Sequence, residues 1–156
     1  MNLVVPPTTF KLPPASKNGH WDFPEDMYSA KHAGFVYAVY DKVLGCGYIG
    51  KKHFHSVTQA RKVESDWKSY MTSSNTLKSH FDVRPKEEFE FICLELYSNR
   101  GDLCYAESWS IITAKALESN AWYNRGVESV GWKVKVPPTA RHKARLSAII
   151  ERVNSI

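Results

Sequence analysis

The segment 88–97 constrains the fold of this chain more than any other part of the sequence. Successive residues of a β-strand point to opposite faces of a sheet, and here both faces are apolar. One face carries Phe89, Phe91, Cys93 and Tyr97, and the other carries Ile92, Leu94 and Leu96. A strand that is apolar on both faces predicts a central position in a sheet that is covered by a layer on each side.

Two earlier segments predict the remaining strands. Residues 34–40 are rich in β-branched and aromatic residues, 41–45 indicates a turn, and 46–51 returns as the second strand of an antiparallel hairpin. The segments that favour helices are 61–71, 76–81, 103–118 and 139–153. This order predicts an α+β fold, a small α/β sandwich whose three-stranded, mainly antiparallel sheet is flanked by helices.

The length of 156 residues predicts one main domain with an extension at each end. Residues 1–32 hold five of the eight prolines together with several aromatic residues, so we expect an extended arm that packs on the domain. The domain itself is expected over 33–136, followed by a basic C-terminal helix over 137–156. No apolar run approaches the ~20 residues of a membrane helix, and the first residues lack the charged region of a signal peptide.

Charge and cysteine content narrow the class of partner and the compartment. Lys and Arg number 21 against 16 Asp and Glu, which gives a net charge of +5 and a pI near 9.1. Such an excess is compatible with a polyanionic partner, most often a nucleic acid. The three cysteines are an odd number without C-x-x-C spacing, which indicates reduced thiols and a cytoplasmic location.

A cluster of glycines over 45–50 spells G-x-G-x-x-G, the superficial form of a dinucleotide-binding fingerprint. That fingerprint has to open a helix whose N-terminus faces the pyrophosphate. The residues that follow the cluster here, 51–55, instead favour a strand and a loop, and the next good strand begins only at 88. We therefore exclude a nucleotide-binding fold.

The same region carries a different resemblance. The triplets 35–37 (Phe-Val-Tyr) and 48–50 (Tyr-Ile-Gly) place two tyrosines 11 residues apart, and Glu107 is followed by Asn124 after 17 residues. With the strings 48–52, 64–70 and 73–74, this order resembles the GIY-YIG nuclease superfamily, in particular its phage-encoded, homing-type branch. The first motif departs from the family pattern, because Phe35 stands where the family usually has glycine. The resemblance implies a metal-dependent endonuclease that cuts DNA.

The resemblance also implies roles for five residues. Glu107 would hold a divalent ion, Mg²⁺ or Mn²⁺, and Asn124 would support the helix that carries Glu107. Tyr37 and Tyr48 would serve as general base and as water or phosphate ligand, in an order that stays open. Arg61 would bind a phosphate, with Lys52, His53, His55 and Lys62 as alternatives.

The residues alone leave another interpretation of Glu107 open. Glu107 falls on a helical stripe with Leu103, Ile111 and Ala114, where a carboxylate is costly unless it is paired with a cation or bound to a metal. The spacing His53-x-His55 also suggests a metal pair, but without a further ligand cluster we expect two solvated loop histidines.

Basic residues are concentrated in two places. We expect DNA to contact the residues after the second motif and, as an extension, those of the C-terminal helix. These residues are Lys51, Lys52, Lys62, Lys68, Arg141, Lys143 and Arg145. Two rival functions stay open: a non-catalytic nucleic-acid-binding or regulatory protein on the same fold, and a phage protein that binds a host protein through its N-terminal arm.

Overall fold

The computed structural model describes residues 15–58 and 61–154. Its centre is a three-stranded sheet of β1 (Gly34–Asp41), β2 (Cys46–His53) and β5 (Phe89–Tyr97), in the order β2-β1-β5. Both strand pairs are antiparallel, with Tyr37 opposite Gly50 and Val39 opposite Tyr48 in the hairpin. The predicted α+β fold with a three-stranded antiparallel sheet is confirmed.

The strand β5 is apolar on both faces as predicted, but its predicted central position is wrong. The central strand is β1, and β5 lies at the edge. The outer side of β5 is nevertheless covered, because the Asp22 amide donates to Phe91 O at 2.8 Å and the Cys93 amide donates to Asp22 O at 3.1 Å. Contacts with the segment before β1 therefore replace the strand that a central position would require.

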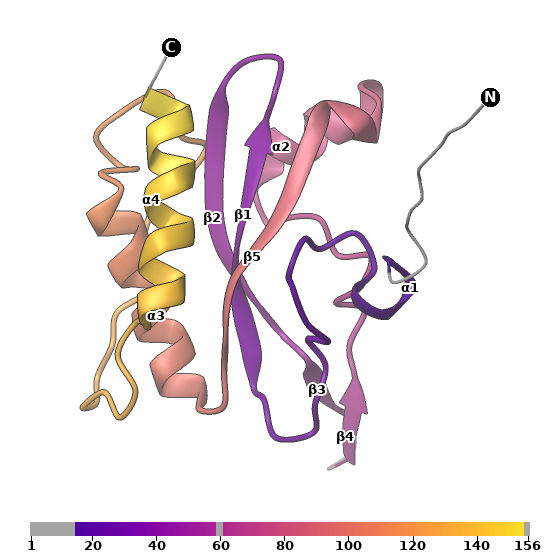
Figure 1. The fold of residues 1–156 in the computed structure, drawn as a ribbon, viewed down its shortest axis with the longest axis vertical. Helices are drawn as coiled ribbons and strands as arrows, with labels where there is room; N and C mark the ends of the chain where they lie inside the picture. The colour runs from indigo at the N-terminus through magenta and orange to yellow at the C-terminus, as the bar shows by residue number, and fades with distance from the viewer. Residues whose placement is uncertain (1–14, 59–60, 155–156) are drawn as a thin grey trace, which may run out of the picture.

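Two layers cover the sheet, one on each face (Figure 1). Helices α3 (Arg100–Thr113) and α4 (Ala140–Asn154) pack on one face, where their apolar residues join Ile49, Ile92 and Leu94 in one core cluster. The opposite face is covered by the segment before β1, which includes the short α1 (Ala15–Asn18), and by α2 (Asn75–Val83), which precedes the 3-10 helix η2 (Lys86–Glu88). Residues 1–14 of the expected arm lie outside the described residues. No helix of the part described is long and apolar enough to cross a lipid bilayer.

The helix expected over 61–71 is wrong. Residues Arg61–Glu64 form β4, which pairs antiparallel with β3 (His55–Thr58) in a separate two-stranded sheet. The apolar residues that suggested a helical stripe lie in different surroundings, since Val63 is exposed on β4 and Trp67 is fully buried. Trp67 is fixed by tertiary contacts, because its indole donates to Glu64 at 2.8 Å and its carbonyl accepts from the Trp21 indole at 2.7 Å.

The helix expected over 103–118 begins at Arg100 and ends earlier, at Thr113. Its C-terminus is a Schellman motif, in which the Ala116 amide donates to Ile111 O and the Lys115 amide donates to Ile112 O, both at 3.0 Å. Lys115 takes the left-handed conformation (φ 55°) that glycine usually supplies. Because no glycine follows the helix at this point, its end could not be predicted from the sequence.

The C-terminal helix α4 belongs to the same core as the sheet. Its residues Leu146, Ile149 and Val153 are buried, and the fully buried ring of His142 bonds Tyr97 Oη at 2.9 Å and Ser110 Oγ at 2.6 Å. Burial lowers the pKa of His142 to about 4, so the ring is neutral at pH 7. The neutral ring ties α4 to both β5 and α3.

Candidate active site

An open cleft of about 720 Å³ lies beside β2, the edge strand of the hairpin. Its walls come from four segments that are distant in the sequence: β2, the start of α2, the middle of α3 and the loop 123–128. The side chains that matter chemically in it are Tyr48, Lys51, Ser73, Glu107, Arg125 and Glu128. Polar residues from separate elements thus meet at one place on the surface.

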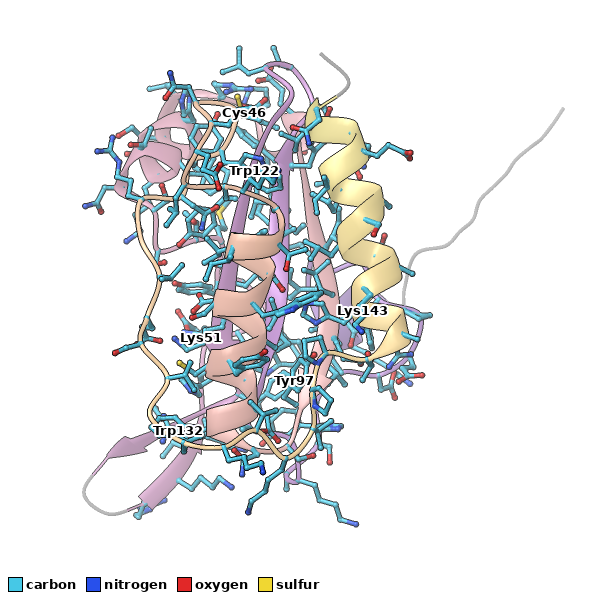
Figure 2. All side chains as sticks on the ribbon, turned by 90° about the vertical axis from the view of Figure 1, so that its left-hand side faces the viewer. Cys46, Lys51, Tyr97, Trp122, Trp132 and Lys143 are labelled. Atoms are coloured by element: carbon cyan, nitrogen blue, oxygen red, sulfur yellow. The ribbon has the colours of Figure 1, made fainter. Side chains whose placement is uncertain are left out.

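The carboxylate of Glu107 is held next to a cation. Lys51 Nζ lies 3.5 Å from Glu107 Oε1, and both side chains are largely buried, with exposed fractions of 17% and 13%. Lys51 also forms an ion pair with Glu128, whose backbone carbonyl accepts from Ser108 Oγ at 2.9 Å. Figure 2 shows Lys51 beside α3, on the opposite side of that helix from Lys143.

Burial and neighbouring charges determine the protonation states of Glu107 and Lys51. Burial raises the pKa of Glu107 above its ordinary value, and the nearby Lys51 ammonium only partly offsets this. Burial opposes the charge on Lys51, but the hydrogen bond to Glu128 and the charge of Glu107 together raise the pKa of Lys51, so the ammonium persists at neutral pH. A buried carboxylate is therefore kept in contact with one positive charge.

The hydroxyl of Tyr48 faces the same cleft. It shares a hydrogen bond of 2.8 Å with Ser73 Oγ, in which either oxygen can donate. Burial raises the pKa of Tyr48 despite that hydrogen bond, so the phenol is protonated at neutral pH. Tyr48 thus presents a neutral hydroxyl, able to donate or to accept a hydrogen bond, in the cleft that contains the Glu107 carboxylate.

Tyr37 lies beneath the cleft rather than in it. Its side chain is fully buried, packed against the rings of Trp21 and Tyr48 with centroids 4.9 Å and 6.2 Å away. A Cβ atom at position 50 would lie 2.5 Å from the Tyr37 hydroxyl oxygen, so the glycine of the second motif makes room for this ring. The hydroxyl has no hydrogen-bond partner among the described residues, and burial raises the pKa of Tyr37 well above its ordinary value.

Asn124 holds β2 rather than the Glu107 helix, which corrects the expected contact. Its side-chain amide donates to Ile49 O at 2.8 Å, and its side-chain oxygen accepts from the Ile49 amide at 3.0 Å. The preceding residue, Tyr123, donates from its hydroxyl to the buried Asp41 at 2.9 Å, and Asp41 also binds Arg84 in a bidentate ion pair. The loop that carries the cleft wall is thereby fixed against the strand that carries Tyr48 and Lys51.

Comparison with models of protein families shows to which family the chain belongs. Residues 21–127, well over half of the chain, match the family described as "Putative endonuclease segE, GIY-YIG domain". The chain belongs to this GIY-YIG endonuclease family. Searches of curated proteins and of solved structures found no match. Family membership gives the chain the general role of a nuclease, with a nucleic acid as substrate.

The arginine expected at the GIY-YIG site is not where the sequence analysis placed it. Arg61 is exposed on β4 and does not line the cleft. Arg125 does line the cleft, and the sequence analysis missed it. Its only sequence signal is that it directly follows Asn124. In this member of the GIY-YIG family, Arg125 and Lys51 are the basic side chains of the cleft.

The basic residues that follow the second GIY-YIG motif were expected to contact DNA together. In the structure their side chains point in different directions. Lys51 enters the cleft, whereas Lys52, on the opposite face of β2, binds Asp66 at 2.8 Å and lies over the Tyr70 ring at 4.0 Å. Lys62 is exposed on β4. Lys68 lies 5.7 Å from the Trp67 ring centroid, and its carbonyl accepts from the His20 amide.

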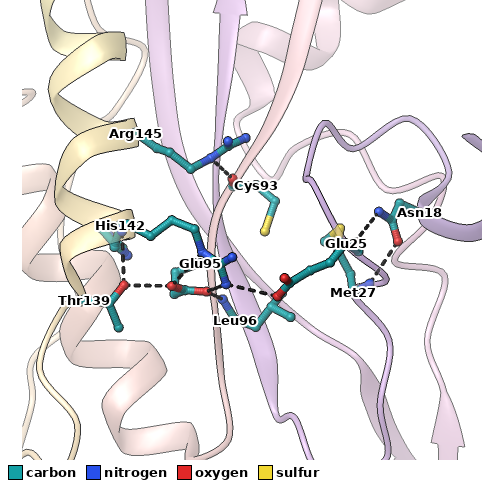
Figure 3. A network of polar contacts seen from close by, with 10 residues as sticks. Asn18, Glu25, Met27, Cys93, Glu95, Leu96, Thr139, His142 and Arg145 are labelled. Atoms are coloured by element: carbon teal, nitrogen blue, oxygen red, sulfur yellow. Dashed lines mark hydrogen bonds and ion pairs between the residues drawn. The ribbon is translucent and has the colours of Figure 1, made fainter.

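The basic residues of α4 lie at the other edge of the GIY-YIG sheet, beside β5. Arg141 binds Glu95 at 2.7 Å, and Arg145 donates to Cys93 O and Asp22 O, each at 2.8 Å (Figure 3 shows the contacts around Glu95 and Cys93). These two arginines bind the protein itself and are distant from the cleft across the sheet. Lys143 is exposed, with its ammonium 6.0 Å from the Trp109 ring centroid.

The cleft of this GIY-YIG domain offers few acidic ligands. Among residues 15–58 and 61–154, no three His, Cys, Asp or Glu side chains are grouped so that they could hold a metal ion. Glu107 and Glu128 both contact the Lys51 ammonium, so the site already accommodates a positive charge. Mg²⁺ is usually bound by one or two carboxylates and keeps several water ligands. Glu107 and Glu128 in the open cleft fit such an ion.

Proposed function

We propose that this protein is a metal-dependent endonuclease that hydrolyses DNA phosphodiester bonds, encoded by a phage. The observation that supports it best is that the Glu107 carboxylate and the Tyr48 hydroxyl line one open cleft, with a cation 3.5 Å from the carboxylate. Hydrolysis of a phosphodiester needs an activated water, neutralisation of charge in the transition state and assistance to the leaving oxygen. In the cleft, Tyr48 is suited to the first requirement, and a metal ion held by Glu107, together with Arg125, would serve the other two.

The residues of the chain divide these tasks. Glu107 would hold Mg²⁺ or Mn²⁺, which when bound supplies a Lewis acid at the phosphate. Tyr48, whose hydroxyl bonds Ser73, is placed to orient the attacking water by a hydrogen bond and, in its ionised phenolate form, to accept the proton that the water loses. Arg125 can bind phosphate oxygens through its planar guanidinium. Asn124 is a positioning residue, because its side chain bonds both backbone groups of Ile49 on β2. Tyr37 is a positioning residue as well, because its fully buried ring packs against the ring of Tyr48.

The proposed function is tested by incubating supercoiled plasmid DNA with the protein in the presence of Mg²⁺, Mn²⁺ or EDTA. We expect nicked or linear DNA with either metal and none with EDTA. A parallel incubation with a structured RNA of similar length tests the preference for DNA. DNA binding without cleavage at any metal concentration would instead support the non-catalytic nucleic-acid-binding protein on the same fold.

The raised pKa of Glu107 gives cleavage a characteristic pH dependence. Only the ionised carboxylate can serve a metal, so the rate should fall as the pH falls, and should do so at a higher pH than for an ordinary glutamate. The charge of Glu128 raises the pKa of Glu107, while Lys51 lowers it. Glu128→Gln removes the repulsion between the two carboxylates, so that the Lys51 ammonium acts on Glu107 alone. The pKa of Glu107 should then fall, and the decrease of the cleavage rate on the acid side (the acid limb) should move to lower pH.

Single-turnover rates between pH 5 and 8 at fixed Mg²⁺ measure this shift. Glu118→Gln, an exposed glutamate that does not line this cleft, is the matched control and should leave the acid limb where it is in the unmodified protein. An acid limb that moves to higher pH in Glu128→Gln would contradict the assignment of the titrating group to Glu107.

A further inference from the structure

Another, smaller pocket lies beside the small β3–β4 sheet. Figure 1 shows this small sheet at the lower end of the molecule. The pocket has a volume of about 180 Å³ and is formed by the segment before β1, the end of β2, the small β3–β4 sheet and the start of α3. We name it the basic pocket, and its basic side chains are Lys31, His32, His53, His55, Lys62 and Arg100. It shares no residue with the cleft that contains Glu107.

The charge of the basic pocket is of one sign. Of the residues that the structure describes, no aspartate or glutamate lines it. Lys31, Lys62 and Arg100 are exposed, and within the described part of the chain none of the three forms an ion pair. This contrasts with Lys51, Arg84 and Arg141, each of which is neutralised by a carboxylate. Cations that converge without a counter-charge are the electrostatic signature of an anion site.

The histidines of the basic pocket add hydrogen-bonding capacity. His32 Nδ1 is buried and has no hydrogen-bond partner among the residues described. His55 Nε2 bonds the Tyr28 hydroxyl at 2.8 Å, which fixes its ring. Burial and the positive charges of Arg100 and Lys51 lower the pKa of His53, although the charge of Glu128 opposes them. A negatively charged ligand would relieve that repulsion.

A metal ion does not explain this arrangement. Three histidines are present, but within residues 15–58 and 61–154 no three His, Cys, Asp or Glu side chains stand close enough together to hold a metal. Three neighbouring cations would also repel a divalent ion. The ligand that matches both the charge and the donors is a phosphate group.

We propose that the basic pocket binds a phosphodiester group of the DNA strand on one side of the cleavage site. The inference rests on the proposed function, because it assigns a second contact to the same substrate. Lys51 in the cleft and His53 in the basic pocket are two residues apart on β2, so both point to the same face, about 7 Å apart along the strand. DNA rises about 3.4 Å per nucleotide along its axis, so the two sites are close enough to contact neighbouring phosphates of one strand.

The test compares two double variants of equal charge. Lys31→Ala with Arg100→Ala removes two cations of the basic pocket, and Lys42→Ala with Lys86→Ala removes two exposed cations at the opposite end of the sheet. Affinity for a 20-base-pair duplex is measured by fluorescence anisotropy against salt in EDTA. Each lost phosphate contact should flatten the log–log slope by about 0.9. The pocket variant, which loses its one phosphate contact, should therefore flatten by about 0.9, and the control should not change.

Histidine ring resonances provide a second measurement on the unmodified protein. Addition of the duplex should shift the ring signals of His32 and His53 and leave the buried His142 unmoved. If the unmodified protein does not bind the duplex at all, the proposed function fails. If it binds, but both double variants show the same slope and the signals of His32 and His53 do not move, the proposed function stands and the basic pocket is not a phosphate site.

Discussion

Replacing Glu107 by glutamine is expected to reduce plasmid cleavage by about a thousandfold or more. The change keeps the shape of the side chain and removes its charge, so the metal loses its one largely buried carboxylate. A metal that acts as Lewis acid stabilises the transition state by several kcal/mol, and each 1.4 kcal/mol is worth a factor of ten in rate. Single-turnover cleavage of plasmid in Mg²⁺ measures the loss.

The same variant should keep its affinity for DNA, because cations supply most non-specific binding. Glu151→Gln makes the identical chemical change on the exposed face of α4 and should leave the rate unaltered. If Glu107→Gln cuts at the rate of the unmodified protein, the metal site lies elsewhere. If it loses cleavage and duplex affinity together while its thermal unfolding is unchanged, then Glu107 serves substrate binding instead of metal binding.

The strands of the sheet could be predicted from the sequence because their signals are local. The hairpin expected over 34–40 and 46–51 extends over Gly34–Asp41 and Cys46–His53, and its turn contains Gly45 at φ 71°. The covering of both faces of β5 followed from its two apolar faces. Its place at the edge did not, because Asp22 and Arg145 satisfy its outer backbone groups from distant parts of the chain.

The helix expected over 61–71 shows where periodicity misleads. Helical spacing is shown by Val63, Trp67, Tyr70 and Met71. The segment nevertheless contains a strand and a turn. A short apolar pattern does not distinguish a helical stripe from residues buried singly by tertiary contacts. Trp67 is buried through its hydrogen bonds with Trp21 and Glu64, and neither contact can be deduced from the spacing.

Some residues of the candidate site could likewise be predicted from the sequence, and others could not. Glu107 was identified through the resemblance to the GIY-YIG family. Its position on an apolar stripe added only that the carboxylate requires a partner, and one partner is Lys51, 56 residues earlier. Arg125 was missed because the loop 123–128 has no periodic pattern to place it. Arg141 and Arg145 were expected to contact DNA, but Glu95 and the carbonyl groups of Cys93 and Asp22 bind them.

The two motif tyrosines are expected to differ sharply when each is changed to phenylalanine. Tyr48→Phe removes a hydroxyl that faces the cleft and bonds Ser73, so cleavage should fall by about 10²- to 10⁴-fold, the range for loss of a proton-transfer group. Tyr37→Phe removes a buried hydroxyl that has no hydrogen-bond partner among residues 15–58 and 61–154. Its loss should leave cleavage within a few-fold and raise the free energy of unfolding by about 1 kcal/mol.

The pair forms its own matched control, because both variants lose one oxygen atom from neighbouring rings of the same hairpin. Cleavage rates in Mg²⁺ and urea unfolding curves are measured for both proteins. Unfolding separates a chemical from a structural effect, since Tyr48→Phe should lose activity without a comparable loss of stability. If Tyr37→Phe is the inactive variant and Tyr48→Phe cuts normally, then the buried tyrosine reaches the substrate through a rearrangement of the layer formed by Trp21 and Tyr70, and the roles assigned to the two residues are reversed.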